Sequence, residues 1–147
     1  MNTATGLFHI ECTSQTLIVT VTSDLRECNY PDIEAGAEEI LHILDGGKVR
    51  NIVLDLQRTD YYGSTALGIF VKLWKRVKER DGHMALCGLS DLEKEILKVT
   101  HLYGLWPICP SRQEALKVIE LQDELRRVPQ GDMDSESGQR IRSRRNP

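Results

Sequence analysis

The segment 51–57, NIVLDLQ, constrains the fold of this 147-residue chain more than any other stretch. Its apolar residues follow one another almost without interruption, which is typical of a strand covered on both faces. The segment 66–80 then places apolar side chains at helical spacing on one side and five basic residues on much of the other. A buried strand followed by an amphipathic helix indicates an α/β fold with parallel strands.

The segments on either side extend this pattern. At the N-terminal end, a run with moderate alternation and a run rich in β-branched residues are joined by a link short enough for a hairpin, so we expect them to pair antiparallel. Pro31 and the pair Gly46–Gly47 bound one helix, and capping boxes that begin at Ser90 and Ser111 open two more. The expected strands are 7–14, 16–25, 51–57, 83–89 and 105–110, and the expected helices are 29–48, 66–80, 91–102 and 112–127. This order predicts a mixed sheet with helices packed against it.

The last twenty residues differ in composition from the rest. From Val128 onward, proline, glycine, serine and charged residues dominate, so 1–127 is expected to be one domain and 128–147 a disordered tail. Four arginines make the end of the tail basic. We expect a solubilising end, and docking of nucleic acid or of an acidic partner is the alternative.

Composition excludes several classes of function. A net charge of −3 is too small to indicate a nucleic-acid partner, and no apolar run approaches the roughly 20 residues of a membrane span. The first ten residues lack the basic and apolar parts of a secretory signal, so we expect a cytoplasmic protein. Cys12, Cys28, Cys87 and Cys109 are scattered without metal-ligand spacing, and the last two lie in apolar runs typical of a core. Neither a metal nor a cofactor is expected.

The turn 59–68, TDYYGSTALG, is the candidate functional segment. Ser64 at the start of a helix could accept a backbone N–H as a cap, or Thr65 could do so and leave Ser64 free, while Gly63 relieves the steric limit at the turn. The same position suits a phosphate, because free N–H groups and the helix dipole favour anions. GxSxG, Walker-type and GxGxxG motifs are absent, and we expect no catalytic residues.

The series of motifs in 51–89 resembles the central segment of STAS domains, the family of anti-sigma factor antagonists. A strand ending in LDL, a turn, a serine and threonine that open a helix with Leu67 and Gly68, and a strand ending in ALCGL follow in the family's order. The resemblance continues through 92–116 and covers about 7–121 in all. Two positions depart from the family pattern, since Gly63 stands where aspartate is usual and Ala66 where glycine is usual.

The resemblance implies a single STAS-like domain with a mixed four- to five-stranded sheet and helices mainly on one face. It implies that Ser64 matches the serine that partner kinases phosphorylate, with Thr65 as a second candidate. The partner would be an anti-sigma factor or a serine/threonine kinase of the GHKL type. The partner-binding residues expected from the turn are Asp60, Tyr61, Tyr62, Gly63 and Leu67.

Three functions therefore stay open. The first is a non-enzymatic regulatory module of the anti-sigma factor antagonist type, switched by phosphorylation at the turn. The second is a STAS-like scaffold subunit of a stress-signalling or transport complex, without a switch, in which Ser64 is only a cap. The third is a nucleotide or small-anion binder that uses the same helix N-terminus.

Overall fold

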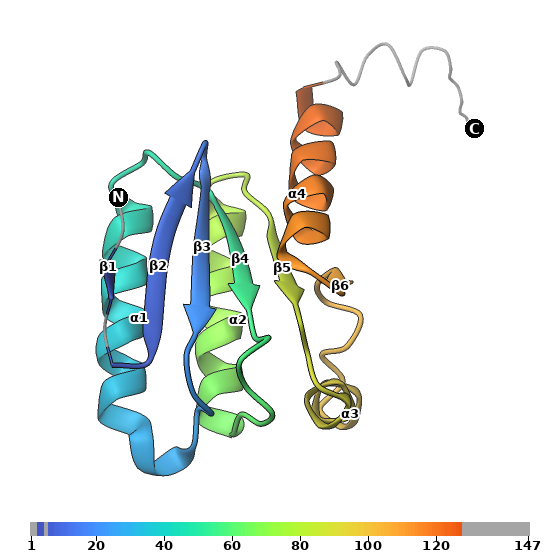
Figure 1. Cartoon of the computed structure of the whole chain (residues 1–147). Helices are drawn as coiled ribbons and strands as arrows, with labels where there is room; N and C mark the ends of the chain where they lie inside the picture. Colours follow the sequence, from blue (N-terminus) through green and yellow to red (C-terminus); the bar gives the residue numbers. More distant parts are fainter. Residues whose placement is uncertain (1–2, 5, 128–147) are drawn as a thin grey trace, which may run out of the picture.

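A computed structural model describes residues 3–4 and 6–127, which form one sheet with helices on both sides (Figure 1). The strands stand in the sheet in chain order, and their bounds are β1 Thr3–Ala4, β2 Phe8–Thr13, β3 Thr16–Val21, β4 Asn51–Asp55, β5 Met84–Cys87 and β6 Ile108–Cys109. Strands β1, β2 and β3 pair antiparallel, whereas β3, β4, β5 and β6 pair parallel. The predicted mixed α/β sheet is confirmed, and the two-residue β1 adds an edge strand to the five expected.

The predicted hairpin joins β2 to β3. Its register runs from Phe8 opposite Val21 to Thr13 opposite Thr16, which leaves only Ser14 and Gln15 in the turn. Ser14 has a positive φ of 55°, as one position of such a tight turn requires. Two-residue connections of this kind fix strand register, so the apolar side chains of both strands meet the same core.

The helices are α1 Tyr30–Asp45, α2 Ser64–Glu79, α3 Asp91–Val99 and α4 Arg112–Arg127, with a short 3-10 turn, η1, at Glu27–Asn29. Helices α1 and α2 lie side by side against one face of the sheet, and α4 lies on the other side near β5 and β6 (Figure 1). The short α3 lies beyond the end of β5 (Figure 1). The expectation of helices mainly on one face holds for the two long central helices.

The strand predicted from NIVLDLQ is buried on both faces. All five residues of β4 are buried, and successive side chains enter different clusters. Ile52 and Leu54 join the main core beneath α1 and α2, whereas Val53 joins a smaller core beneath α4. The smaller core also contains Cys87 and Cys109, whose burial confirms their structural role, and desolvation raises the pKa of Cys87 to about 12.

Arg112, the first residue of α4, ties this helix to three strands. Its guanidinium Nε and Nη2 donate to Asp55 Oδ2 at 3.1 and 3.0 Å, Nη2 also donates to Thr20 Oγ1 at 2.8 Å, and Nη1 donates to Glu11 Oε2 at 3.2 Å. The side chain of Asp55 is only 7% exposed, so this pair supplies a cation to a carboxylate whose other oxygen accepts the Gln57 N–H at 3.0 Å. The contact fixes where α4 crosses the sheet.

The helix ends follow the sequence signals in most cases. Pro31 lies in the first turn of α1, and Gly47 after its end has a left-handed φ of 84°. Both halves of the Ser90–Glu93 capping box are present, and at Ser111 the hydroxyl accepts the Glu114 N–H at 3.3 Å. No helix among residues 3–4 and 6–127 is long and apolar enough to cross a membrane. The tail predicted for 128–147 lies outside the described residues.

Candidate functional site

The loops that follow β3 and β4 lie against each other because these strands are parallel and end at the same edge of the sheet. Leu25 and Tyr62 form an isolated parallel bridge between the two loops, and the Gly63 N–H donates to the Leu25 carbonyl at 2.9 Å. The residues 24–27, which we call the β3–α1 segment, therefore form one wall of the predicted turn. Residues outside the turn therefore help to fix its conformation.

Asp24 fixes the first half of the turn. Its Oδ1 accepts the backbone N–H groups of Asp60 at 2.9 Å and Tyr61 at 3.3 Å. Its Oδ2 pairs with the Arg26 guanidinium at 3.1 Å, and that guanidinium lies 5.3 Å from the centre of the Tyr61 ring. Two backbone donors and one cation thus converge on a single carboxylate, and the cation in turn contacts the Tyr61 ring.

Glu27 fixes the second half of the turn and the start of α2. Ser64 Oγ donates to Glu27 Oε2 at 3.2 Å, the Thr65 backbone N–H donates to the same oxygen at 3.3 Å, and Thr65 Oγ1 bonds to Glu27 Oε1. The Thr65 hydroxyl and then its backbone N–H are the main causes that hold the pKa of Glu27 below its usual range. Glu27 is therefore an ionised carboxylate at the positive end of α2.

The predicted capping role of the hydroxyls is wrong. The N-cap residue of α2 is Gly63, and neither Ser64 nor Thr65 accepts a backbone N–H there. Both hydroxyls instead donate outward to Glu27, a residue 37 or 38 positions earlier, and the carboxylate takes the orphan donor of Thr65. A long-range contact has replaced the local cap, so Ser64 has no helix-capping function that would exclude chemistry.

The space at Gly63, and not its backbone conformation, is what favours glycine there. Its φ of −97° and ψ of −174° are extended backbone that any residue adopts, so the turn does not demand glycine. A Cβ at this position would lie 2.3 Å from Glu27 Oε2. The carboxylate of Glu27 thus fills the space where a side chain at position 63 would begin.

On its other side the turn is bonded to the start of α3. The Tyr62 hydroxyl donates to the Glu93 carbonyl at 2.8 Å, the Ser90 hydroxyl donates to the Asp60 carbonyl at 2.8 Å, and Thr59 Oγ1 bonds to the Glu93 carboxylate. The side chain of Glu93 is fully buried, and this desolvation raises its pKa. The turn is therefore a preorganised element between two segments, the β3–α1 segment and α3.

The predicted site residues divide into exposed and buried groups. Ser64 and Asp60 are exposed, and Tyr61 and Thr65 are half-buried, so these four can meet a partner. Tyr62 is 1% exposed, Leu67 is 6% exposed and Gly63 is buried, so these three residues offer little surface, and the expectation that they bind a partner stays a prediction. Tyr62 packs edge-on against Phe70 and belongs to the core.

Sequence reasoning missed Asp24 and Glu27. Both follow the end of β3, and parallel strands bring the loops at their carboxyl ends together. That rule, applied to the predicted strands 16–25 and 51–57, could have placed acidic residues of the first loop beside Ser64. The exact partners depend on loop geometry that the sequence pattern does not encode.

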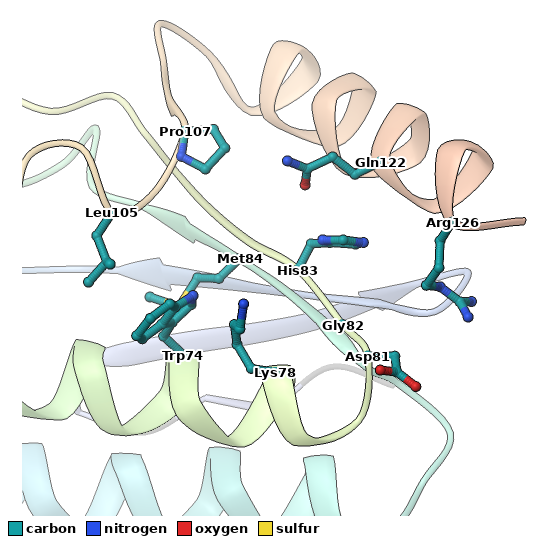
Figure 2. Close-up of a pocket in the computed structure, with 10 residues that line it drawn as sticks. All are labelled: Trp74, Lys78, Asp81, Gly82, His83, Met84, Leu105, Pro107, Gln122 and Arg126. Carbon is teal, nitrogen blue, oxygen red and sulfur yellow. The ribbon is translucent and has the colours of Figure 1, made fainter. Parts of the chain in front are cut away.

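A concave region lies at the end of α2 opposite the turn. It encloses about 450 Å³ between the end of α2, the start of β5, the loop before β6 and α4 (Figure 2). Lys78, His83 and Arg126 are its basic residues, and Lys78 Nζ lies 5.5 Å from the centre of the Trp74 ring. None of the predicted site residues lines it, and among the described residues no group of His, Cys, Asp and Glu could hold a metal ion.

Known proteins share both the sequence pattern and this architecture. The chain is 28% identical over 99 residues to BtrV of Bordetella bronchiseptica, which is named an anti-sigma factor antagonist; the match covers 67% of this chain and 82% of BtrV. A STAS domain protein of Planctomyces limnophilus is 30% identical, with a TM-score of 0.68 over 77% of this chain and 97% of that one.

SpoIIAA, an anti-sigma factor antagonist of Bacillus, has the same fold. Its unphosphorylated form gives a TM-score of 0.66 at 18% identity, over 83% of this chain and 98% of SpoIIAA. Its phosphorylated form gives 0.58 at 18% identity, over 76% of this chain and 98% of that one. The family model described as STAS domain matches residues 8–115. With these matches and the strand order described above, the chain belongs to the STAS domain family.

Proposed function

We propose that this protein is a non-enzymatic, cytoplasmic regulatory module of the anti-sigma factor antagonist type, switched by phosphorylation of Ser64. The observation that carries the proposal is an exposed serine hydroxyl at the start of α2, presented by a turn bonded on both sides. The names of its relatives support the antagonist role, and the existence of a phosphorylated form of SpoIIAA supports the kind of switch. The proposed partner is an anti-sigma factor or a serine/threonine kinase of the GHKL type.

Ser64 suits a phosphoryl acceptor better than Thr65 does. Ser64 is exposed and makes one bond of 3.2 Å to Glu27, whereas Thr65 is half-buried and bonds to Glu27 through both its hydroxyl and its backbone N–H. A kinase must bring the acceptor oxygen into line with the γ-phosphorus of ATP. Freeing the Ser64 hydroxyl breaks a single contact, so Ser64 is the acceptor and Thr65 anchors the helix start.

The phosphoryl transfer itself needs nothing from this chain beyond the hydroxyl. A bond forms between Ser64 Oγ and the γ-phosphorus of the kinase's ATP, the bond from that phosphorus to the β–γ bridging oxygen breaks, ADP leaves, and the hydroxyl proton passes to a base. The product carries about −1.5 to −2 charges in place of a neutral hydroxyl. A partner that packs on the turn then meets an uncompensated anion, and the complex is weakened.

The small-anion alternative conflicts with the geometry at the start of α2. An anion bound there would lie beside the ionised Glu27 carboxylate, which already accepts the Thr65 backbone N–H. Like charges at this distance repel, so a nucleotide phosphate gains little from the helix dipole. The scaffold alternative makes the opposite prediction to the switch, namely that Ser64 stays unmodified.

Phosphate mapping tests the proposal directly. Fragment mass spectrometry of the chain isolated from its own cells should locate a phosphate on Ser64, and Ser64→Ala should remove it without unfolding the protein. Ser64→Asp should weaken binding of the GHKL-type kinase from the same cells. Ser14→Asp is the matched control, because it adds the same charge at an exposed turn where a positive φ suits Asp. An unmodified Ser64 under all growth conditions, with equal binding by both Asp variants, would favour the scaffold function.

A further inference from the structure

Glu27 lies far from the turn in sequence but contacts the candidate phosphoryl acceptor, Ser64, directly. Its two carboxylate oxygens accept three hydrogen bonds from the first two residues of α2. One of these oxygens occupies the space that a side chain at position 63 would fill. The contact joins the β3–α1 segment to the start of α2 across 37 residues of sequence. It is the last in a series of contacts that begins with Asp24 and continues through Leu25.

We infer that Glu27 is part of the modification site: its carboxylate holds the unmodified hydroxyls, and a phosphoryl group on Ser64 displaces the Glu27 side chain from the start of α2. The inference rests on the proposed phosphorylation of Ser64. It extends that function by making phosphorylation a change of shape as well as of charge. Glu27 is a positioning residue here, since it touches the acceptor and takes no part in the transfer.

The displacement follows from charge and space together. In the unmodified protein Ser64 Oγ is a donor to Glu27 Oε2 at 3.2 Å. Once the oxygen is esterified it has no hydrogen to donate, and its phosphoryl oxygens are acceptors with negative charge. Glu27 then loses one donor and meets a repelling group within contact distance. The neighbouring cation in sequence, Arg26, offers no compensation because it is paired with Asp24.

The contacts that remain set the limit of the release. Asp24 still accepts the N–H groups of Asp60 and Tyr61, and the Leu25 carbonyl still accepts the Gly63 N–H. These bonds do not involve Ser64, so the turn and the bridge to Tyr62 persist. The η1 turn also keeps its own bonds, since the Asn29 N–H donates to the Arg26 carbonyl at 2.9 Å and the Asn29 side-chain amide donates to the Asp24 carbonyl at 3.3 Å. The released part is therefore the Glu27 side chain. A partner that contacts both the start of α2 and the Glu27 carboxylate would sense the modification at two places.

A substitution at Gly63 should displace the Glu27 side chain in the same way without adding a charge. A methyl group there would lie 2.3 Å from Glu27 Oε2 in a backbone conformation that alanine adopts freely. The flexible end of the Glu27 side chain, and not the backbone, would have to move. Gly63→Ala should therefore expel Glu27 from the start of α2 while Ser64 remains a neutral serine.

An NMR pH titration of the purified full chain tests the inference, with the Thr65 backbone amide as probe. In the wild type this amide shift should follow the ionisation of Glu27, with a midpoint below the usual glutamate range, because the Thr65 hydroxyl and N–H hold that pKa down. Glu27→Gln should remove the titration, and Glu39→Gln on α1 is the matched control that should leave it unchanged. In both Ser64→Asp and Gly63→Ala the low midpoint should be lost.

Two results would overturn the inference: an unchanged low midpoint in Ser64→Asp, or a low midpoint that survives Glu27→Gln. Its failure is distinguishable from that of the proposed function. Ser64→Asp with an unaltered Thr65 titration but weakened kinase binding would refute the displacement and keep the switch. If Ser64→Asp lost the low midpoint but bound the kinase as tightly as the wild type, the displacement of Glu27 would be supported and the switch would be refuted.

Discussion

The buried carboxylate of Glu93 gives the sharpest test of how the turn is held. Its side chain has no exposed surface, its Oε1 accepts the Ser90 N–H at 2.9 Å, and its other oxygen bonds to Thr59 in the turn. We compare Glu93→Ala, which removes both contacts, with Glu93→Gln, which keeps the shape and removes only the charge. Glutamine is as suitable as glutamate at this position of a capping box.

The expected cost of Glu93→Ala follows from these two contacts. The Ser90 hydroxyl still caps the helix in this variant, so the lost bond from the Ser90 N–H costs about 1 kcal/mol, and the lost bond between Thr59 and the charged acceptor costs about 1.5–3 kcal/mol. Relief of the carboxylate's desolvation, the same burial that raises its pKa, offsets part of this. The free energy of unfolding should fall by about 2–3 kcal/mol, which corresponds to about 6–12 °C in Tm for a domain of this size.

Glu93→Gln should behave differently because its hydrogen bonds can be rearranged. The amide oxygen can accept the Ser90 N–H, and the amide nitrogen can donate to Thr59 Oγ1, whose single proton is then free for the Leu56 carbonyl 3.0 Å away. No charge is buried in this variant. Its free energy of unfolding at pH 7 should lie within about 1 kcal/mol of the wild type or above it.

The pH dependence of the free energy of unfolding distinguishes the effect of the Glu93 charge from the effect of the side chain's shape. Because burial raises the pKa of Glu93 above its ordinary 4.5, the folded wild type holds this proton at pH values where the unfolded chain has released it. This contribution to stability is fully present below 4.5 and is lost as pH rises through the raised pKa. The stability of Glu93→Gln relative to the wild type should therefore increase over the same window.

Urea unfolding from pH 4 to pH 7, followed by the fluorescence of Trp74 and Trp106, measures all of this. Glu95→Ala, an exposed change on the same helix, should stay within about 0.5 kcal/mol of the wild type. If Glu93→Ala were as stable as this control, the contacts between α3 and the turn would contribute nothing. If the curves of Glu93→Gln and the wild type ran parallel with pH, the carboxylate would not be desolvated.

Two further predictions concern the packing around the site. Tyr62→Phe removes the bond to the Glu93 carbonyl but keeps the ring against Phe70, so it should cost about 1 kcal/mol in urea unfolding with an unchanged m value; an unchanged midpoint would contradict that bond. Arg112→Met leaves the buried Asp55 without its cation and should cost about 2–3 kcal/mol, less than a fully buried pair because the Arg112 side chain is 31% exposed. Adding Asp55→Asn should restore part of that loss, and a purely additive double variant would show that the two side chains are not coupled.

Regular patterns in the sequence were sufficient for the fold. The near-continuous apolar run at 51–57 predicted a strand covered on both faces, and β4 contributes to the cores beneath both helical layers. Capping at Ser90 was predictable because a capping box is a local arrangement within four residues. The two-residue β1 was not predictable, since its pairing with β2 is a tertiary contact with no periodic signal.

The sequence by itself determined the order of strands and helices, because hydrophobic periodicity and end signals act over a few residues. It also placed two hydroxyls at the start of α2. Only the tertiary structure decided what those hydroxyls do. Parallel pairing of β3 and β4 brings Glu27 into contact with Ser64 and Thr65, so a carboxylate distant in sequence replaces the local cap. The same carboxylate occupies the space beside Gly63. Such contacts depend on where two loops meet in space, and no pattern within either loop specifies that meeting.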